Sequence, residues 1–252
     1  MASLERLMQR KLLLLLCMLH ANKLPLRHLF VCCDGGHGTT GPESFGGPIG
    51  KLAGTPVHLL DLINFTPMES PQPDLPDHIW KDISADQIFL YQYVKAIQEG
   101  RVPPSLKLCK CGPINHSRWL TLAIRLLILY TQTENPSQGL ITLVTYIMQV
   151  YAPMWFILKK ASSFTDATFA LFTWMKLMER QPESVQLVVK PVVQHNAWPA
   201  EPGYMLCAMM SSNDASARIK AVTMIRALRK KPRMKILVIK LLLKKRVKIN
   251  LS

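Results

Sequence analysis

The chain has 252 residues, of which 49% are apolar and 19% are charged. This length is enough for one large or two modest domains with a buried core, and the apolar content excludes wholesale disorder. Lys and Arg number 31 against 16 Asp and Glu, and the net charge of +15 indicates a polyanionic partner such as nucleic acid or an anionic membrane, unless the basic residues only form a solvated face.

The N-terminal segment, residues 1–33, is expected to be helical over 4–30, with a break or a new start at Pro25. Basic residues precede an apolar run at 12–19, which is the layout of a secretory signal. The acidic residue within the basic part, and a leucine where the cleavage site needs a small residue, favour instead a helix that is buried in a core.

Residues 34–82 are rich in Gly and Pro and predict a long loop segment. The glycines within 36–41 match a dinucleotide-binding pattern, but Pro42 and further glycines follow where that site needs a helix N-terminus. Gly50-Lys51 also fails as a phosphate-binding loop, because a leucine stands where Ser or Thr would bind magnesium. Both motifs are interpreted as turns, and no cofactor is expected.

The predicted helical core spans residues 83–212. Ser84 and Gln87 form a capping-box pattern that begins a helix ending near Gly100. The Val-rich residues 185–193 are strand-like, although a proline interrupts them. Further helices are expected over residues 116–132, 136–160 and 165–180.

Within this core, residues 140–158 are uncharged and long enough to span a bilayer. Thr142, Thr145 and Gln149 recur at helical spacing on one side. This pattern favours a helix buried in a soluble core over a membrane span, which remains the alternative.

The basic C-terminal segment, residues 213–252, begins with a predicted helix that ends at Arg229 and has Ser212 or Asn213 as its N-cap. No acidic residue follows position 214, whereas residues 215–252 hold thirteen Lys and Arg. A block of this kind is typical of nucleic-acid binding. The candidate nucleic-acid-binding residues within it are Arg226, Arg229, Lys230, Lys231, Arg233, Lys244, Lys245 and Arg246.

The six cysteines do not have the spacing of a disulfide framework, so a reducing, intracellular compartment is expected, with a nuclear location favoured. Two groups could supply zinc ligands, namely Cys109 with Cys111 and His116, and Cys32 with Cys33 and His37. Neither spacing fits a closed four-ligand site, so no metal is expected. Because paired carboxylates and nucleophile motifs are also lacking, no catalytic residue is assigned and the chain is expected not to be an enzyme.

Five short segments of the chain resemble a family of invertebrate proteins that carries no known function. They lie at residues 24–29, 47–51, 116–121, 150–156 and 193–198. The resemblance covers roughly residues 12–212, which is most of the chain.

A more distant resemblance is to the hAT-type transposases, which carry a Cys-x-x-His motif and later an Arg-Trp motif in a helical insertion. Cys17, His20, Arg118 and Trp119 match these motifs in order. The resemblance implies a helix on which Trp119 stacks on an unpaired base and Arg118 contacts phosphate, unless Trp119 is a core residue. The family's metal-binding carboxylates have no counterpart at the expected distances, which implies a catalytically inactive fragment or a repurposed derivative.

The sequence therefore predicts a mainly α-helical fold with few or no strands. The expected function is non-enzymatic binding of DNA or RNA through the basic C-terminal segment. The alternatives are a helical scaffold for a protein partner and a membrane protein with a span near residues 140–158.

Overall fold

The computed structural model describes residues 18–40, 44–55, 63–107, 111–112, 114, 120–160, 170, 173–174, 176–196 and 215–229. Within these ranges the chain forms helices and loops without a strand, which confirms the mainly α prediction. The elements are α2 (Met18–Cys33), α3 (Pro48–Gly54), α4 (Asp77–Asp82), α5 (Ala85–Glu99), α6 (Pro104–Lys107), α7 (Leu120–Tyr130), α8 (Gln138–Tyr146), the π-helical turn η3 (Ile147–Tyr151), α9 (Ala152–Lys160), α11 (Glu183–Asn196) and α13 (Ala215–Arg229).

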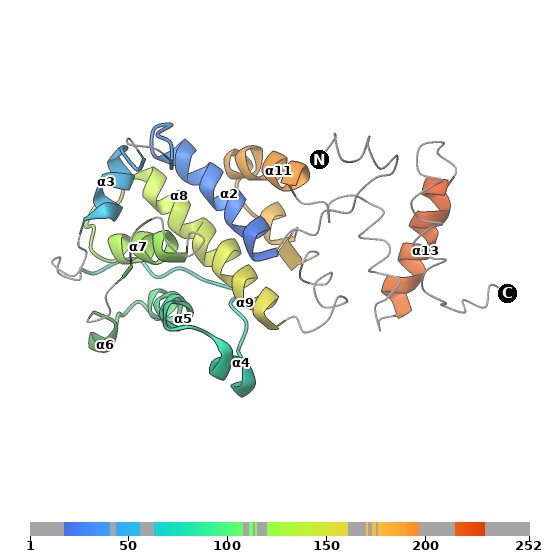
Figure 1. Ribbon diagram of the computed structural model, residues 1–252, viewed down its shortest axis with the longest axis horizontal. Helices are drawn as coiled ribbons and strands as arrows, with labels where there is room; N and C mark the ends of the chain where they lie inside the picture. Colours follow the sequence, from blue (N-terminus) through green and yellow to red (C-terminus); the bar gives the residue numbers. More distant parts are fainter. Residues whose placement is uncertain are drawn as a thin grey trace, which may run out of the picture.

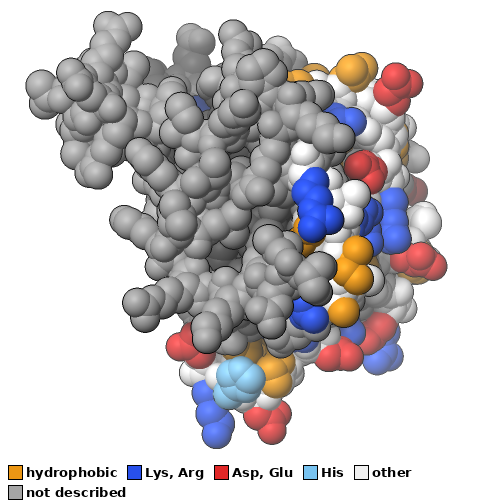
Figure 2. All heavy atoms as spheres, turned by 90° about the vertical axis from the view of Figure 1, so that its right-hand side faces the viewer, with side chains coloured by type: hydrophobic (Ala, Val, Ile, Leu, Met, Phe, Trp, Pro, Cys, Tyr) orange, Lys and Arg blue, Asp and Glu red, His pale blue; other side chains and the backbone are white. Residues whose placement is uncertain are grey.

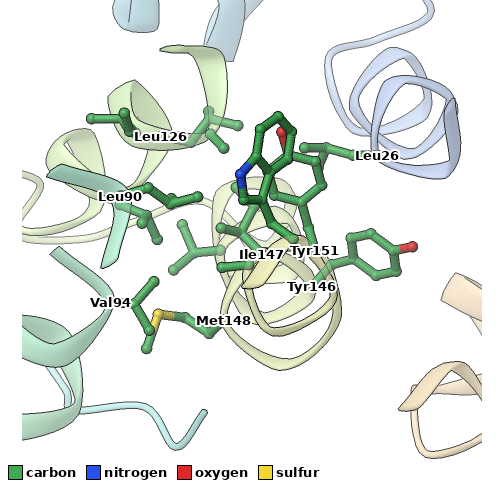
Figure 3. Packing of buried hydrophobic residues seen from close by; sticks show 14 of the residues in the cluster. Leu26, Leu90, Val94, Leu126, Tyr146, Ile147, Met148 and Tyr151 are labelled. Atoms are coloured by element: carbon green, nitrogen blue, oxygen red, sulfur yellow. The ribbon is translucent and has the colours of Figure 1, made fainter. Parts of the chain in front are cut away.

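One continuous helix, made of α8, η3 and α9, runs through the centre of the fold (Figure 1). α2 and α7 pack against α8, α5 packs against α9, and α11 packs against α2. Figure 3 shows Leu26 from α2, Leu90 from α5 and Leu126 from α7 converging on η3. Hydrophobic burial around this helix is therefore the main source of stability in the described fold.

The central helix is also the segment whose length and composition would suit a membrane span. Its 23 residues pass that test, but 72% of the most apolar window is buried inside the structure. All side chains from 146 to 156 are buried except that of Gln149, which is half-buried. This is the arrangement expected of a core helix.

The π-helical turn ends two residues before Pro153. The N–H of Ala152 donates to the carbonyl of Ile147 rather than to that of Met148. In this register the Met148 carbonyl faces position 153, where proline has no N–H to donate. The hydroxyl of Ser70 donates to the Met148 carbonyl instead.

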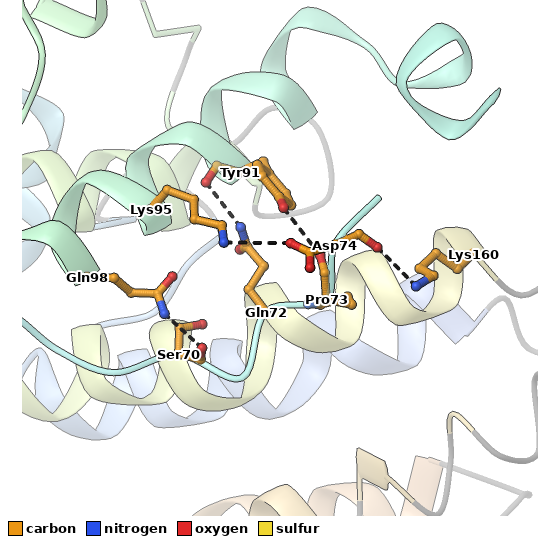
Figure 4. A network of polar contacts seen from close by, with 8 residues as sticks. All are labelled: Ser70, Gln72, Pro73, Asp74, Tyr91, Lys95, Gln98 and Lys160. Carbon is orange, nitrogen blue, oxygen red and sulfur yellow. Dashed lines mark hydrogen bonds and ion pairs between the residues drawn. The ribbon is translucent and has the colours of Figure 1, made fainter. Parts of the chain in front are cut away.

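Ser70 belongs to an extended segment, residues 63–76, which we call the strap. The strap has no internal helix and lies along α5 and the central helix (Figure 4). Helix side chains satisfy its carbonyls, because Tyr130 donates to Thr66 over 2.8 Å and Gln98 donates to Ser70 over 2.9 Å. The strap is thus held as a bound peptide would be, through its backbone carbonyls.

Two further strap carbonyls, near its C-terminal end, also accept from helix side chains. The Tyr91 hydroxyl donates to the carbonyl of Pro73 over 3.4 Å, and Lys160 Nζ donates to that of Asp74 over 3.0 Å. Lys95 Nζ lies 3.8 Å from the Asp74 carboxylate, which is almost fully exposed, so this ion pair contributes little. The strap lies within residues 34–82, the segment predicted as a Gly/Pro-rich loop, which also contains the short helices α3 and α4.

α2 ends in a Schellman motif that leads into α3. Gly35 is left-handed, with φ of 73°, and the N–H of Gly36 donates to the carbonyl of Val31 over 2.8 Å. The side chain of Asp34 is completely buried, and its Oδ1 accepts from the N–H groups of Ile49 at 2.8 Å and Gly50 at 2.9 Å. These are orphan donors in the first turn of α3, so Asp34 performs the capping role that Gly47, the N-cap residue, has no side chain to perform.

This arrangement corrects the interpretation of Gly50-Lys51 as a turn. Both residues lie inside α3, and a helix does follow the glycine-rich residues, seven positions after the last glycine of 36–41. Its first N–H groups are occupied by the Asp34 carboxylate rather than by a phosphate. The sequence does carry a signal for this helix, which is Pro48 at the first helical position, where proline is favoured.

The strand-like interpretation of residues 185–193 is wrong, because these residues lie in α11. Val185, Val189 and Val192 are buried and recur at helical spacing on the side that packs against α2. Pro191 is exposed, so the side of α11 on which it removes a helix hydrogen bond faces solvent.

Two helix boundaries that were predicted at prolines also differ in the structure. Pro25 lies inside α2 and does not break it, because burial of Leu26 and Phe30 offsets the lost hydrogen bond. The helix predicted to begin with Pro136 in its first turn begins at Gln138, and Ser137 is the N-cap. The capping box at Ser84, in contrast, is confirmed at the start of α5, which ends at the left-handed Gly100.

Candidate functional site: the basic C-terminal helix

The described part of the basic segment is α13, which Figure 1 shows apart from the helices around α8. Its bounds confirm the predicted end at Arg229. Arg218, Lys220 and Arg226 are all exposed, and so is Ile219, at 67% of its surface. α13 contains no acidic residue, so these cations have no acidic neighbour within their own helix.

Most of the predicted nucleic-acid-binding residues lie outside the described part of the chain. The structure places Arg226 on the exposed side of α13 and Arg229 at the C-terminal end of the same helix. The residues outside the described ranges are Lys230, Lys231, Arg233, Lys244, Lys245 and Arg246, together with Arg118 and Trp119.

The helices that surround α8 contrast with α13 in their charge. Residues 18–196 hold fifteen Lys and Arg against thirteen Asp and Glu, so the excess of positive charge is confined almost entirely to residues 215–252. Figure 2 draws the face that lies on the right-hand side of Figure 1. On the described part of that face, acidic, basic and apolar side chains are interspersed. A polyanion would therefore meet a concentrated positive field at the C-terminal segment and a nearly neutral surface elsewhere.

Of the four residues that match the transposase motifs, the structure describes only the backbone of His20, which lies in α2. Cys17, Arg118 and Trp119 lie outside the described ranges. The expectation that Arg118 and Trp119 lie on a helix therefore falls on residues that the structure does not describe, just before the start of α7 at Leu120.

The candidate zinc ligands are only partly described. Cys32 and His37 are exposed and Cys33 is half-buried, whereas Cys109 and His116 lie outside the described residues. Burial, with smaller contributions from Cys32 and Asp34, raises the pKa of Cys33 from 9.0 to about 11. Within the described ranges, no three His, Cys, Asp or Glu residues gather as a metal site would require.

Arg125 is a half-buried cation that the sequence alone did not single out. It is the one charged residue of α7, whose other side chains are buried. Its Nη1 donates to the carbonyl of Ala53 over 2.8 Å, and its Nε and Nη2 donate to the carbonyl of Gly112 over 3.1 and 2.9 Å. These bonds all go to backbone carbonyls, near the end of α3 and in the loop before α7, so the role of Arg125 is structural.

No protein-family model matches the chain, and no match is found among curated proteins or among solved structures.

Proposed function

We propose that this chain is a non-enzymatic helical protein that binds nucleic acid through its basic C-terminal segment, residues 213–252. The observation that carries the proposal is the exposed basic helix α13 at the start of residues 215–252, which hold thirteen Lys and Arg and no acid. Phosphate neutralisation by such residues releases counterions and provides affinity without reference to base sequence.

The resemblance to the hAT-type transposases supports the same proposal, with the chain as a derivative that retains binding without the carboxylates for strand transfer. In this proposal Arg118 contacts phosphate and Trp119 stacks on an unpaired base. Substitution of Trp119→Ala is then expected to weaken binding to a single strand more than binding to a duplex. Equal effects on the two would remove Trp119 from the interface.

The test of the basic segment is a salt titration of binding to a random DNA duplex, with the full chain and two charge variants. The first variant changes six basic residues of the segment to Gln, namely Lys230, Lys231, Arg233, Lys244, Lys245 and Arg246. The matched control changes six exposed basic residues outside it, namely Lys51, Lys81, Arg101, Lys176, Arg180 and Lys190.

The slope of log affinity against log salt concentration is expected to be steep for the original chain. In the first variant the magnitude of this slope is expected to be smaller by about 0.9 for each phosphate contact that is lost. The control is expected to keep the slope of the original chain. Equal slopes for all three chains would contradict the proposal. Absence of binding at low salt would remove it and leave the protein-scaffold alternative, for which Leu187 on α11, 70% exposed, would be the first surface to examine.

A further inference from the structure

The exposed side chains that the structure describes on α13 fall within one arc around the helix axis. At about 100° per residue, Arg218 and Lys220 lie about 200° apart, at the two margins of this arc. Ile219 and Arg226 are seven residues apart and therefore lie within about 20° of each other, near the centre of the arc. Thr223 is also exposed and lies between this centre and Lys220.

Ile219 is exposed between the two basic margins of this arc. In the major groove of B-form DNA, cations at the margins of a helix reach the phosphates of the two groove walls, while central residues face the base edges. Ile219 would face the thymine methyl group, which is the apolar feature of that groove, and Arg226 would face guanine acceptors.

The dimensions agree with this geometry. A helix with its side chains is about 10–12 Å wide, and the major groove of B-form DNA is about 12 Å wide. The major groove of an A-form RNA duplex is too narrow and deep for side chains to read. A single strand has no groove with two phosphate walls.

We infer that α13 is a groove-reading helix for B-form duplex DNA, with Arg218 and Lys220 on the phosphates and Ile219 and Arg226 at the base edges. This inference rests on the proposed nucleic-acid function and names its substrate class. It goes beyond charge attraction, because it requires the helix itself and the exposed apolar side chain.

The first experiment distinguishes the contribution of the helical conformation of α13 to DNA affinity from the contribution of its charge. In the full chain, Val222→Pro removes a hydrogen bond inside α13 and breaks the helix without changing any charge, and Val222→Ala is the control that keeps the helix. The probes are a random-sequence DNA duplex, an RNA duplex of the same sequence and a DNA single strand, each titrated with salt. Val222→Pro is expected to lower affinity for the DNA duplex by about tenfold and to leave affinity for the RNA duplex and the single strand unchanged.

The outcomes distinguish the two proposals. If Val222→Pro has no effect and salt-dependent binding persists, the segment binds only as a polycation, so the inference fails and the proposed function stands. If the original chain binds the RNA duplex as tightly as the DNA duplex, the groove assignment fails. If none of the probes binds, both proposals fail, and binding to anionic lipid vesicles alone would assign the basic segment to a membrane surface.

The second experiment tests Ile219 through the thymine methyl group. The original chain is expected to bind a random DNA duplex about fourfold more tightly than the same duplex with uracil in place of thymine, which is the effect of one buried methyl-sized contact. Ile219→Ala is expected to abolish the difference in affinity between the two duplexes and to leave the slope of log affinity against log salt unchanged. Lys220→Gln is expected to lower that slope by about one and to leave the difference between the duplexes unchanged. Equal binding of the two duplexes by the original chain would overturn the role of Ile219.

Discussion

Asp34 and Arg125 hold opposite ends of the same short helix, α3. The Asp34 carboxylate accepts from the N–H groups of Ile49 and Gly50 at the N-terminus, and the Arg125 guanidinium donates to the carbonyl of Ala53 at the C-terminus. The signs of the two charges complement the dipole of the helix at both ends. α3 is therefore attached to α2 through Asp34 and to α7 through Arg125.

Asp34→Ala is expected to lower the free energy of unfolding by about 1–2 kcal/mol, because it leaves two first-turn N–H groups of α3 without an acceptor. Asp34→Asn, which keeps one acceptor oxygen, is expected to cause a smaller loss. Urea unfolding measures both. Asp77→Ala, at an exposed first-turn position of α4, is the control and is expected to change stability by less than about 0.5 kcal/mol.

Arg125→Lys is expected to be destabilising even though it preserves the charge. The ammonium group cannot reproduce the fork that bridges the carbonyls of Ala53 and Gly112, so one of them loses its donor. The double variant with Asp34→Ala is expected to lose less than the sum of the two single losses, because once α3 has detached at one end, its other attachment contributes less. Strict additivity in urea unfolding would contradict this coupling.

Gly50→Ala and Gly54→Ala, in the same helix, are expected to have opposite effects. A Cβ on Gly50 would lie 2.5 Å from the carbonyl oxygen of Phe45 and 2.7 Å from Oδ2 of Asp34, so backbone must move. A Cβ on Gly54 meets nothing within 4 Å. We expect a loss of at least about 2 kcal/mol for Gly50→Ala, and no loss or a gain of up to about 1 kcal/mol for Gly54→Ala. Thermal unfolding of the two variants side by side is the measurement.

Ser70→Ala is expected to cost about 1–3 kcal/mol, because it removes the donor to the Met148 carbonyl beside the π-helical turn. The same change in a Pro153→Ala background is expected to cost less, since residue 153 then has an N–H of its own. Four unfolding curves complete this double-mutant cycle. An equal cost of Ser70→Ala in both backgrounds would show that Pro153 is not the reason why Met148 needs Ser70.

Stability is expected to fall as the pH rises through the alkaline range. Burial raises the pKa of Cys33 from 9.0 to about 11, so the unfolded chain releases the thiol proton at lower pH than the folded chain does. The contribution of Cys33 is therefore complete below about pH 9 and is lost between about pH 9 and 11. Cys33→Ala is expected to flatten this part of the pH profile of the unfolding free energy, whereas Cys32→Ala, which removes only a smaller contribution to the raised pKa of Cys33, is expected to change it much less.

Local signals in the sequence were sufficient for several elements. The capping box at Ser84 and Gln87 predicted the start of α5, and Gly100 predicted its end, because these interactions join residues only a few positions apart. The basic block at 215–252 was equally evident, since charge can be counted without a fold.

The tertiary structure decided where proline is tolerated and which polar groups meet. Pro25 and Pro191 each weaken a helix by local propensity, but packing of Leu26 and Val189 into the core offsets that cost, which no local pattern can register. Asp34 meets α3 fifteen residues later, and Ser70 meets Met148 across 78 residues. The sequence by itself determined the helical class and the distribution of charge, whereas these partnerships arose only from folding, because burial brings distant groups together and leaves each buried polar atom in need of a partner.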